Sequence, residues 1–463
     1  MTGAEKELVN ALDAILGKEH VFSSPEDLIT YAYDASAPNL DVAPLAIVRP
    51  GNRDEVCEIL KYANKRGIPV VPRGSGTGLA GATVPASDSI VLLMTRMNKI
   101  IEVDEANLTA LAEPGVITSH LASAVEAKGL FYPPDPGSMA VSTLGGNVAH
   151  NSGGLRGLKY GVTRDYVMGL EVVLASGEVL TTGGKCKKDV AGYNLTSLFI
   201  GSEGTLGVVT QILIRLIPLP ETQRTALAFF DDIHTAAQVV SDIIAARIIP
   251  VSLELLDATS IQCVDDFAKL NLPQDMGAML LIEVDGAVEV VDREIDHVEK
   301  ICQRNNAQRL EIARDKSHAD QLKAARRSTL AALARRKPTT ILEDVTVPRD
   351  KIPEMVQQIR KIANEQNVEI AIFGHAGDGN LHPTGMTDAR DKDELRRVEI
   401  AFEEIFKAAL SLGGTITGEH GVGLKKRHVL PLKVGTTGIA TMAAIKRALD
   451  PNNILNPGKV LAL

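Results

Sequence analysis

The chain has 463 residues, of which 45% are hydrophobic and 23% are charged, and its formal net charge is −9 at pH 7. This length and composition predict a globular enzyme with two or three hydrophobic cores. The acidic balance argues against nucleic acid as a partner, and the 3% aromatic content without Trp argues against base-stacking surfaces. The four Cys residues form no CxxC pair, so the chain itself offers no local site for an iron–sulfur cluster.

The first 20 residues have the pattern of an amphipathic helix, without the basic start and apolar run of a signal peptide. No uninterrupted apolar run reaches the roughly 18 residues that a membrane span needs. We therefore expect a cytoplasmic protein that reaches the inner face of a membrane only through a partner.

Residues 46–71 predict a strand, a helix and a second strand. Apolar residues at helical spacing run over 54–66, Gly67 ends the helix, and short apolar runs at 46–48 and 68–71 flank it. Further strands separated by turn residues continue to about Pro218. This first half of the chain is therefore expected to be α+β.

The segment "VVPRGSGTGLAGATVP" at residues 70–85 contains the pattern G-x-G-x-x-G between Gly76 and Gly81. A Rossmann fingerprint must open a helix, but Pro85 and a β-type run follow here, and no Lys completes a phosphate-binding P-loop. What remains is a glycine-rich loop whose backbone N–H groups could line an anion site. Taken alone, the segment is better explained as a long turn without a ligand.

Two further glycine-rich segments, 137–161 and 200–210, lie in the same half of the chain, and both are expected to be loops. Three such loops would allow the backbone to approach a large, phosphate-bearing cofactor closely.

From about Thr222, strands alternate with long charged helices, as expected for a ferredoxin-like layer of helices on an antiparallel sheet. The predicted helices cover 233–248, 290–306, 317–336 and 354–367, and a last helix covers 435–450.

Two histidines flank a Gly-Asp-Gly turn in "FGHAGDGNLHP", and a return of the strand after this turn would bring His375 and His382 together. Further on, "ITGEHGVG" places Glu419 beside His420. Two His and one carboxylate are a common set of ligands for a divalent metal. The histidine pair by itself equally fits polar residues that cap the ends of strands.

The motifs "PRGSGTGLAG", "PPDPGS", "TLGGNVAHNSGG", "GSEGTLG" and "NPGK" together resemble the FAD-binding domain of the vanillyl-alcohol-oxidase-type flavoenzymes. The pattern HxGDGNxH…GEHG is similar to that of the D-2-hydroxyacid dehydrogenase branch, which includes D-lactate dehydrogenase and the FAD subunit of glycolate oxidase. The resemblance implies an α+β fold with a two-subdomain FAD-binding domain at 1–220. It also implies a ferredoxin-like cap domain at 221–420 that carries the metal site, and a C-terminal segment at 421–463 that returns to the flavin.

The resemblance also implies where FAD binds. Residues 73–78 would hold the pyrophosphate, 143–147 and 201–205 would flank the flavin, and Asn456 would contact the isoalloxazine. Relatives that attach FAD covalently carry a His where this chain has residues 76–78, so non-covalent FAD is implied. The complete predicted set is Pro72, Arg73, Gly74, Ser75, Gly76, Thr77, Gly78, Pro136, Gly137, Ser138, Thr143, Gly145, Gly146, Asn147, Ser152, Gly153, Gly201, Glu203, Gly204 and Asn456.

Oxidation of a 2-hydroxy acid removes the hydroxyl proton and transfers a hydride from Cα to flavin N5. A divalent metal (Zn, Mn or Fe) on His375, His382 and Glu419 would orient the hydroxyl and lower its pKa. His420 would take the proton, although the roles of Glu419 and His420 could be exchanged. Arg326 matches the family's substrate arginine, with Arg327 as the alternative, and a solvated basic helix face is the simpler explanation of both.

The D-2-hydroxyglutarate members carry a Thr and a Lys at positions that correspond to Leu330 and Leu342 here. A second substrate carboxylate would therefore lack partners, which favours D-lactate or glycolate. The alternatives are a D-2-hydroxyglutarate dehydrogenase, a flavin ether-lipid synthase-like enzyme, a flavin-free metallohydrolase and a non-catalytic electron-relay subunit.

Electrons must leave the flavin, so an external acceptor is expected: a quinone, a cytochrome, an electron-transferring flavoprotein or an iron–sulfur subunit. A homodimer or a heteromer is expected.

Overall fold

The computed structural model describes residues 2–36 and 42–463 and divides the chain into two compact units. The first unit comprises Met1–Ser152, Val162–Leu219 and Glu419–Leu463, and the second comprises Gly153–Gly161 and Pro220–Gly418. Both units mix helices and strands, which confirms the predicted α+β class.

The first unit contains two main sheets, a four-stranded one in the order β1-β2-β4-β3 and a five-stranded one in the order β5-β6-β10-β8-β9. Its strands are β1 (Val21–Phe22), β2 (Ala46–Val48), β3 (Val70–Arg73), β4 (Ile90–Leu93), β5 (Ile100–Asp104), β6 (Thr109–Ala112), β7 (Leu130–Phe131), β8 (Val167–Val173), β9 (Val179–Gly183), β10 (Val208–Arg215) and β11 (Ile217–Pro218). Its helices are α1 (Gly3–Leu16), α2 (Pro25–Thr30), α3 (Arg53–Arg66), α4 (Thr118–Glu126), α5 (Leu144–His150), α7 (Leu195–Phe199) and α15 (Leu430–Leu449).

The predicted strand–helix–strand near the N-terminus is confirmed as β2, α3 and β3. Asn52 caps α3 by accepting the N–H of Glu55, and Gly67 ends the helix in the left-handed conformation at φ 64°. The chain then passes from β3 through the glycine-rich loop to β4 without an α-helix, and the two strands pair in parallel. The G-x-G-x-x-G segment is therefore not a Rossmann turn.

The second glycine-rich segment differs from the predicted loop, because α5 runs through Gly145 and Gly146. The Thr143 side chain caps this helix by accepting the N–H of Gly146, and Asn151 ends it with φ 54°. The glycines serve close packing, since a Cβ at Gly145 would lie 2.6 Å from Cβ of Pro114. Short helices of this kind escape sequence patterns because capping and packing outweigh the low helix propensity of glycine.

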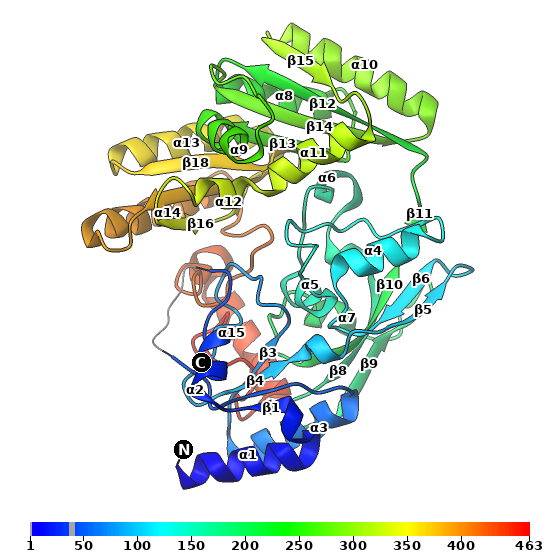
Figure 1. The fold of residues 1–463 in the computed structure, drawn as a ribbon, viewed down its shortest axis with the longest axis vertical. Coiled ribbons are helices and arrows are strands. Elements are labelled where there is room, and N and C mark those ends of the chain that lie inside the picture. The colour runs from blue at the N-terminus through cyan, green and yellow to red at the C-terminus, as the bar shows by residue number, and fades with distance from the viewer. Residues whose placement is uncertain (1, 37–41) are drawn as a thin grey trace. The chain divides into compact units, whose positions relative to one another are not determined.

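The C-terminal segment completes the first unit. Leu455 forms a parallel bridge with Val70 of β3, and Ile454 and Leu455 lie in the same core cluster as Ile90 and Leu92. Figure 1 shows this end of the chain, in red, beside β3 and β4. The predicted last helix is the second part of α15, which kinks at Gly435, where φ is 67°.

A buried ion pair fixes this segment. Lys446 Nζ pairs with the Asp450 carboxylate and donates to the carbonyls of Thr205 (2.9 Å) and Leu455 (2.8 Å). Asp450 also accepts the N–H groups of Ile454 and Leu455. Burial lowers the pKa of Lys446 below its ordinary value, against the opposing effect of Asp450.

The second unit is built on an eight-stranded antiparallel sheet in the order β15-β12-β14-β13-β18-β19-β16, with β17 also paired to β19. Its strands are β12 (Thr222–Phe230), β13 (Ser252–Asp257), β14 (Ala278–Gly286), β15 (Arg309–Ile312), β16 (Thr339–Leu342), β17 (Val345–Thr346), β18 (Glu369–His375) and β19 (Asn380–Thr387). Its helices are α6 (Gly157–Tyr160), α8 (Ile233–Ala245), α9 (Ala258–Ala268), α10 (Val288–Arg304), α11 (Lys316–Arg327), α12 (Thr329–Leu333), α13 (Ile352–Glu365) and α14 (Lys392–Ser411).

Helices cover both faces of this sheet. Residues of α9, α11 and α12 form one core cluster with Leu227 and Phe229 of β12, whereas Ala226 of the same strand packs with α10. The helices predicted to begin at 233, 290 and 354 are confirmed within a few residues as α8, α10 and α13.

The single helix predicted over 317–336 is wrong, because the chain breaks at Ser328 into α11 and α12. The hydroxyls of Ser328 and Thr329 donate to the carbonyls of Ala325 (2.7 Å) and Arg326 (2.6 Å), so side chains replace part of the helical hydrogen bonding.

We expect Lys446→Met to destabilise the protein by about 3–5 kcal/mol, because it leaves the buried Asp450 carboxylate without its cation. The matched control is Arg447→Met on the exposed face of the same helix. Denaturant unfolding followed by circular dichroism measures the difference. Equal unfolding midpoints for the two variants would contradict the structural role of the pair.

Candidate active site

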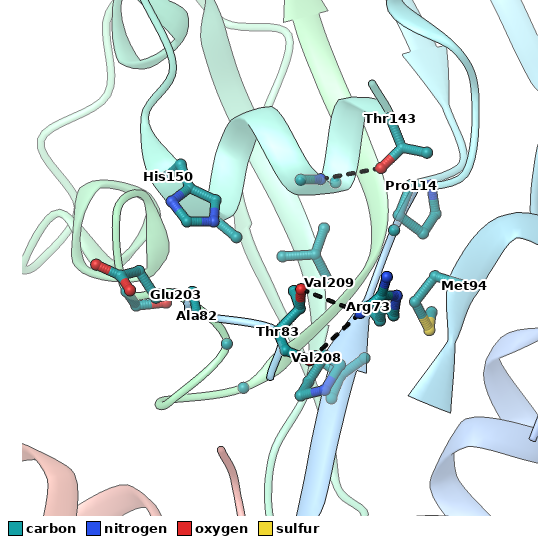
Figure 2. Close-up of a pocket in the computed structure, with 18 of the residues that line it drawn as sticks. Arg73, Ala82, Thr83, Met94, Pro114, Thr143, His150, Glu203, Val208 and Val209 are labelled. Atoms are coloured by element: carbon teal, nitrogen blue, oxygen red, sulfur yellow. Dashed lines mark hydrogen bonds between the residues drawn. The ribbon is translucent and has the colours of Figure 1, made fainter. Parts of the chain in front are cut away.

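A hollow of about 620 Å³ lies within the first unit, where the three glycine-rich segments meet. Its lining residues are Pro72, Arg73, Gly74, Ala82, Thr83, Met94, Pro114, Thr143, Gly145, Gly146, Ala149, His150, Phe199, Ser202, Glu203, Gly204, Gly207, Val208 and Val209. Figure 2 shows Thr143 at the start of α5 and His150 at its end, both beside the hollow.

The backbone around the hollow is kept open by glycine. Gly76 has φ +73°, and a Cβ there would overlap Nη2 of Arg73. A Cβ at Gly74 would overlap Oγ1 of Thr143, which caps α5. Glycine at these two positions therefore leaves room for the side chains of Arg73 and Thr143, both of which line the hollow.

Arg73 supplies a buried positive charge on the wall of the hollow. Its side chain has two long hydrogen bonds, at 3.4 and 3.5 Å, from Nη1 to Oγ1 and the carbonyl of Thr83. Burial lowers the pKa of its guanidinium below the ordinary value. An anionic ligand would offset this desolvation, as the diphosphate of FAD could.

Asn456 is buried and joins two of the glycine-rich loops. Its Nδ2 donates to the carbonyls of Ala82 (2.9 Å) and Glu203 (2.7 Å). In the part of the chain that the structure describes, its Oδ1 has no hydrogen-bond partner. A buried acceptor of this kind suits a ligand N–H group.

The predicted cofactor residues divide into three groups. Pro72, Arg73, Gly74, Thr143, Gly145, Gly146, Glu203 and Gly204 line the hollow, whereas Ser75, Gly76, Thr77, Gly78, Pro136, Gly137, Ser138, Asn147, Ser152, Gly201 and Asn456 are in the first unit but not in this lining, and Gly153 belongs to the second unit. His150 lines the hollow but was not among the predicted contacts. Its position depends on helix α5, which the sequence pattern does not predict.

The second unit brings two predicted metal ligands together. His375 ends β18 and His382 lies on β19, and their ring centroids are 5.1 Å apart with the rings perpendicular. Gly379, at φ +88°, closes the turn between the two strands. Both histidines are more than 90% buried. The predicted strand–turn return is therefore confirmed.

Glu254 on β13 links His375 to Arg326. Its two carboxylate oxygens lie 2.8 and 2.9 Å from Nδ1 of His375, and Oε2 lies 2.6 Å from Nη2 of Arg326. Sequence analysis missed Glu254. The signal that could have found it is an acidic residue in the middle of "VSLELL", a strand that is otherwise nearly apolar and is fully buried.

Arg326 on α11 is only 5% exposed, and its Cζ lies 4.9 Å from the centroid of the Phe373 ring. Its Nε has no hydrogen-bond partner among residues 2–36 and 42–463. The neighbouring Arg327 is more exposed. Arg326 is thus buried, it shares the Glu254 carboxylate with His375, and its Nε–H group is available to a ligand.

Glu419 directly follows Gly418, whose N–H donates to Asp344 Oδ2 of the second unit at 2.5 Å. His375 and His382 offer two ring nitrogens to one ion within the second unit, whereas the third predicted ligand, Glu419, belongs to the first unit. In the first unit, the carbonyl of His420 lies 3.2 Å from Nδ1 of His150, which lines the hollow.

Comparisons with known proteins agree with this architecture. Family models match residues 44–183, described as an FAD binding domain, and residues 219–460, described as the C-terminal domain of FAD linked oxidases. The glycolate oxidase subunit GlcD of Bacillus subtilis is 54% identical over 99% of this chain and 97% of its own length. A D-lactate dehydrogenase of Archaeoglobus fulgidus is 36% identical over 93% of this chain and 95% of its own.

Among solved structures, p-cresol methylhydroxylase with bound substrate matches with a TM-score of 0.84 at 19% identity, over 99% of this chain and 97% of its own. Alkyldihydroxyacetonephosphate synthase matches with a TM-score of 0.76 at 20% identity, over 97% and 84%. Both matches show the fold.

The chain belongs to the FAD-linked oxidases and is an FAD-dependent oxidoreductase. Within that family it falls in the branch of the glycolate oxidase subunits and D-lactate dehydrogenases, which confirms the predicted resemblance. The alternative of a flavin-free metallohydrolase is thereby excluded. None of the helices in residues 2–36 and 42–463 is long and apolar enough to cross a membrane.

We expect Gly76→Ala to weaken FAD binding by about tenfold or more, because alanine is strained at this φ and its Cβ would displace Arg73. The measurement is the ratio of FAD to protein after gel filtration, from the visible absorbance. Gly184→Ala, where a Cβ meets nothing within 4 Å, is the control. Full FAD retention in Gly76→Ala would contradict the assignment of this loop to the cofactor.

Proposed function

We propose that this protein oxidises a short D-2-hydroxy acid, D-lactate or glycolate, to the 2-oxo acid, with FAD as the hydride acceptor and a divalent metal assisting. The observation that carries the proposal is the buried pair of His375 and His382 on adjacent strands of the second unit, whose ring centroids are 5.1 Å apart. A buried Arg326 shares Glu254 with one of these histidines. The similar proteins named as a glycolate oxidase subunit and D-lactate dehydrogenases support the same substrate class.

His375, His382 and Glu419 would hold Zn, Mn or Fe, which acts as a Lewis acid on the substrate hydroxyl and lowers its pKa. Glu254 supports this role, because a carboxylate on Nδ1 fixes the tautomer and orientation of a histidine that binds metal through Nε2. Arg326 would bind the substrate carboxylate, and the Phe373 ring packs against its guanidinium.

His420 would accept the hydroxyl proton. Its place in the first unit supports this role, because its carbonyl lies 3.2 Å from a histidine that lines the hollow. Bound FAD supplies the hydride acceptor. We assign Glu419 as the metal ligand and His420 as the base from the chemistry of their side chains. A carboxylate is the better third ligand, and an imidazole is the better base near neutral pH.

Leu330 on α12 and Leu342 on β16 support a monocarboxylate, because neither side chain can pair with a second carboxylate. A dicarboxylate such as D-2-hydroxyglutarate would leave a charge without a partner at these positions.

Electrons would pass from the flavin to a quinone or to an acceptor protein, such as an electron-transferring flavoprotein or an iron–sulfur subunit. Two similar proteins are named as subunits of glycolate oxidase, which supports a heteromeric assembly. A cytoplasmic location, with membrane contact only through such a partner, is part of the same proposal.

We expect D-lactate or glycolate to bleach the flavin absorbance of the anaerobic protein, and EDTA treatment to stop the bleaching until metal is restored. L-lactate is the stereochemical control. His420→Asn should slow bleaching by about 10²–10⁴-fold, the range of a lost general base. Flavin that no hydroxy acid bleaches would contradict the proposed substrate class, and normal turnover of His420→Asn would contradict the role of His420 as the base.

We expect Arg326→Lys to raise the KM for the hydroxy acid by about 10- to 100-fold, because Lys cannot form the two-point contact with a carboxylate. The matched variant is Arg327→Lys, one residue along the same helix, which should change KM by less than about threefold. Steady-state kinetics with an artificial electron acceptor measures both. The opposite ranking would assign substrate binding to Arg327.

A further inference from the structure

The segment that carries His420 is anchored by a side chain about 220 positions earlier in the sequence. Glu203 belongs to the glycine-rich turn that precedes β10, and it is only 5% exposed. Its Oε1 accepts the N–H of Val422 at 2.7 Å, and its Oε2 accepts the N–H of Gly423 at 2.8 Å. Both oxygens of one buried carboxylate are therefore bonded to consecutive backbone groups of this segment.

The anchor is itself held on the walls of the hollow. The Glu203 N–H donates to the carbonyl of Ala149 at 2.8 Å, and the Glu203 carbonyl accepts Nδ2 of Asn456 at 2.7 Å. The backbone of Glu203 has φ 53°, a conformation that non-glycine residues adopt only when surrounding contacts enforce it. The side chain is thus directed toward Val422 and Gly423 by its own turn.

The segment fits closely against these groups. Gly421 has φ +86°, and a Cβ there would lie 2.7 Å from Oε1 of Glu203 and 2.9 Å from Nδ1 of His150. Leu424 donates its N–H to the carbonyl of Ala80 at 2.9 Å. Residues 420–424 therefore touch all three glycine-rich segments within the first unit.

We propose that Glu203 is a positioning residue that fixes the His420 segment on the flavin-binding loops. The proposal rests on the proposed function in taking His420 as the base. Glu203 acts through the backbone and does not touch the reacting atoms. A carboxylate suits this task because it accepts two N–H groups at once, and charge-assisted hydrogen bonds of this kind are about twice as strong as neutral ones.

Glu203→Gln tests the proposal with little change in shape. The amide has one acceptor oxygen, so it can keep one of the two backbone bonds while its NH₂ group opposes the other N–H. In the holoenzyme we expect hydrogen exchange at the amides of Val422 and Gly423 to accelerate by about tenfold. The limiting rate of flavin reduction should fall by about tenfold or more, while substrate affinity changes by less than about threefold.

The matched control is Glu126→Gln on the exposed surface of the same unit, which should leave exchange and reduction unchanged. Unchanged exchange in Glu203→Gln would overturn the anchor. Faster exchange with a normal reduction rate would overturn the positioning role, and loss of FAD with unchanged exchange would make Glu203 a flavin contact.

The exchange measurement needs no substrate, so it tests the anchor even if no hydroxy acid proves to be oxidised. Should Glu203→Gln fail to fold, the wild-type protein still provides a test. The amides of Val422 and Gly423 should exchange far more slowly than those of the exposed loop at residues 188–193. Equally fast exchange in the two segments would overturn the proposal.

Discussion

The amide of Asn456 is the contact on which the flavin-binding unit depends. One buried Nδ2 group donates to Ala82 in the first glycine-rich loop and to Glu203 in the third, and it does so from the last ten residues of the chain. The carbonyl of Val70 in β3 accepts the backbone N–H of the same residue. Segments that lie more than 200 residues apart are thereby joined at one point, and the C-terminal segment is an integral part of the unit.

Two buried carboxylates serve comparable purposes in the two units. Glu203 holds the backbone that carries His420, and Glu254 holds His375 and Arg326. A buried carboxylate is costly unless it is paired and fully hydrogen-bonded, and each of these has partners for both oxygens. Neither carboxylate needs to touch substrate. Each orders groups that we propose do, so the geometry of the site depends on residues behind it.

Local sequence patterns predicted those helices and turns that depend on residues close together in the chain. The helix at 54–66 follows from its apolar spacing and from Gly67, and the approach of His375 to His382 follows from the strand–turn–strand pattern. The sequence also predicted correctly that residues 70–85 do not form a Rossmann turn, because Pro85 and the β-type run after it are local features. The resemblance of several short motifs to known flavoenzymes identified FAD as the cofactor. The spacing of the glycines alone would have left the identity of the cofactor open.

Other features could not be predicted from the sequence because they depend on how particular side chains bond and pack in the folded chain. Helix α5 forms despite its two glycines because Thr143 caps it and Pro114 packs against it. The break between α11 and α12 depends on the hydrogen bond from the Ser328 hydroxyl to the carbonyl of Ala325. The partners of Glu254 and Glu203 lie between about 70 and 220 residues away along the chain. An acidic residue in a buried strand indicates that a partner exists, but only the fold identifies it.

The most direct test is a crystal structure of the holoenzyme, with the metal located by anomalous scattering. We expect FAD in the hollow between residues 73–78 and 143–147, and one metal ion within about 2.0–2.2 Å of the proposed ligands His375, His382 and Glu419. A metal bound elsewhere, or FAD outside this hollow, would contradict the proposed site.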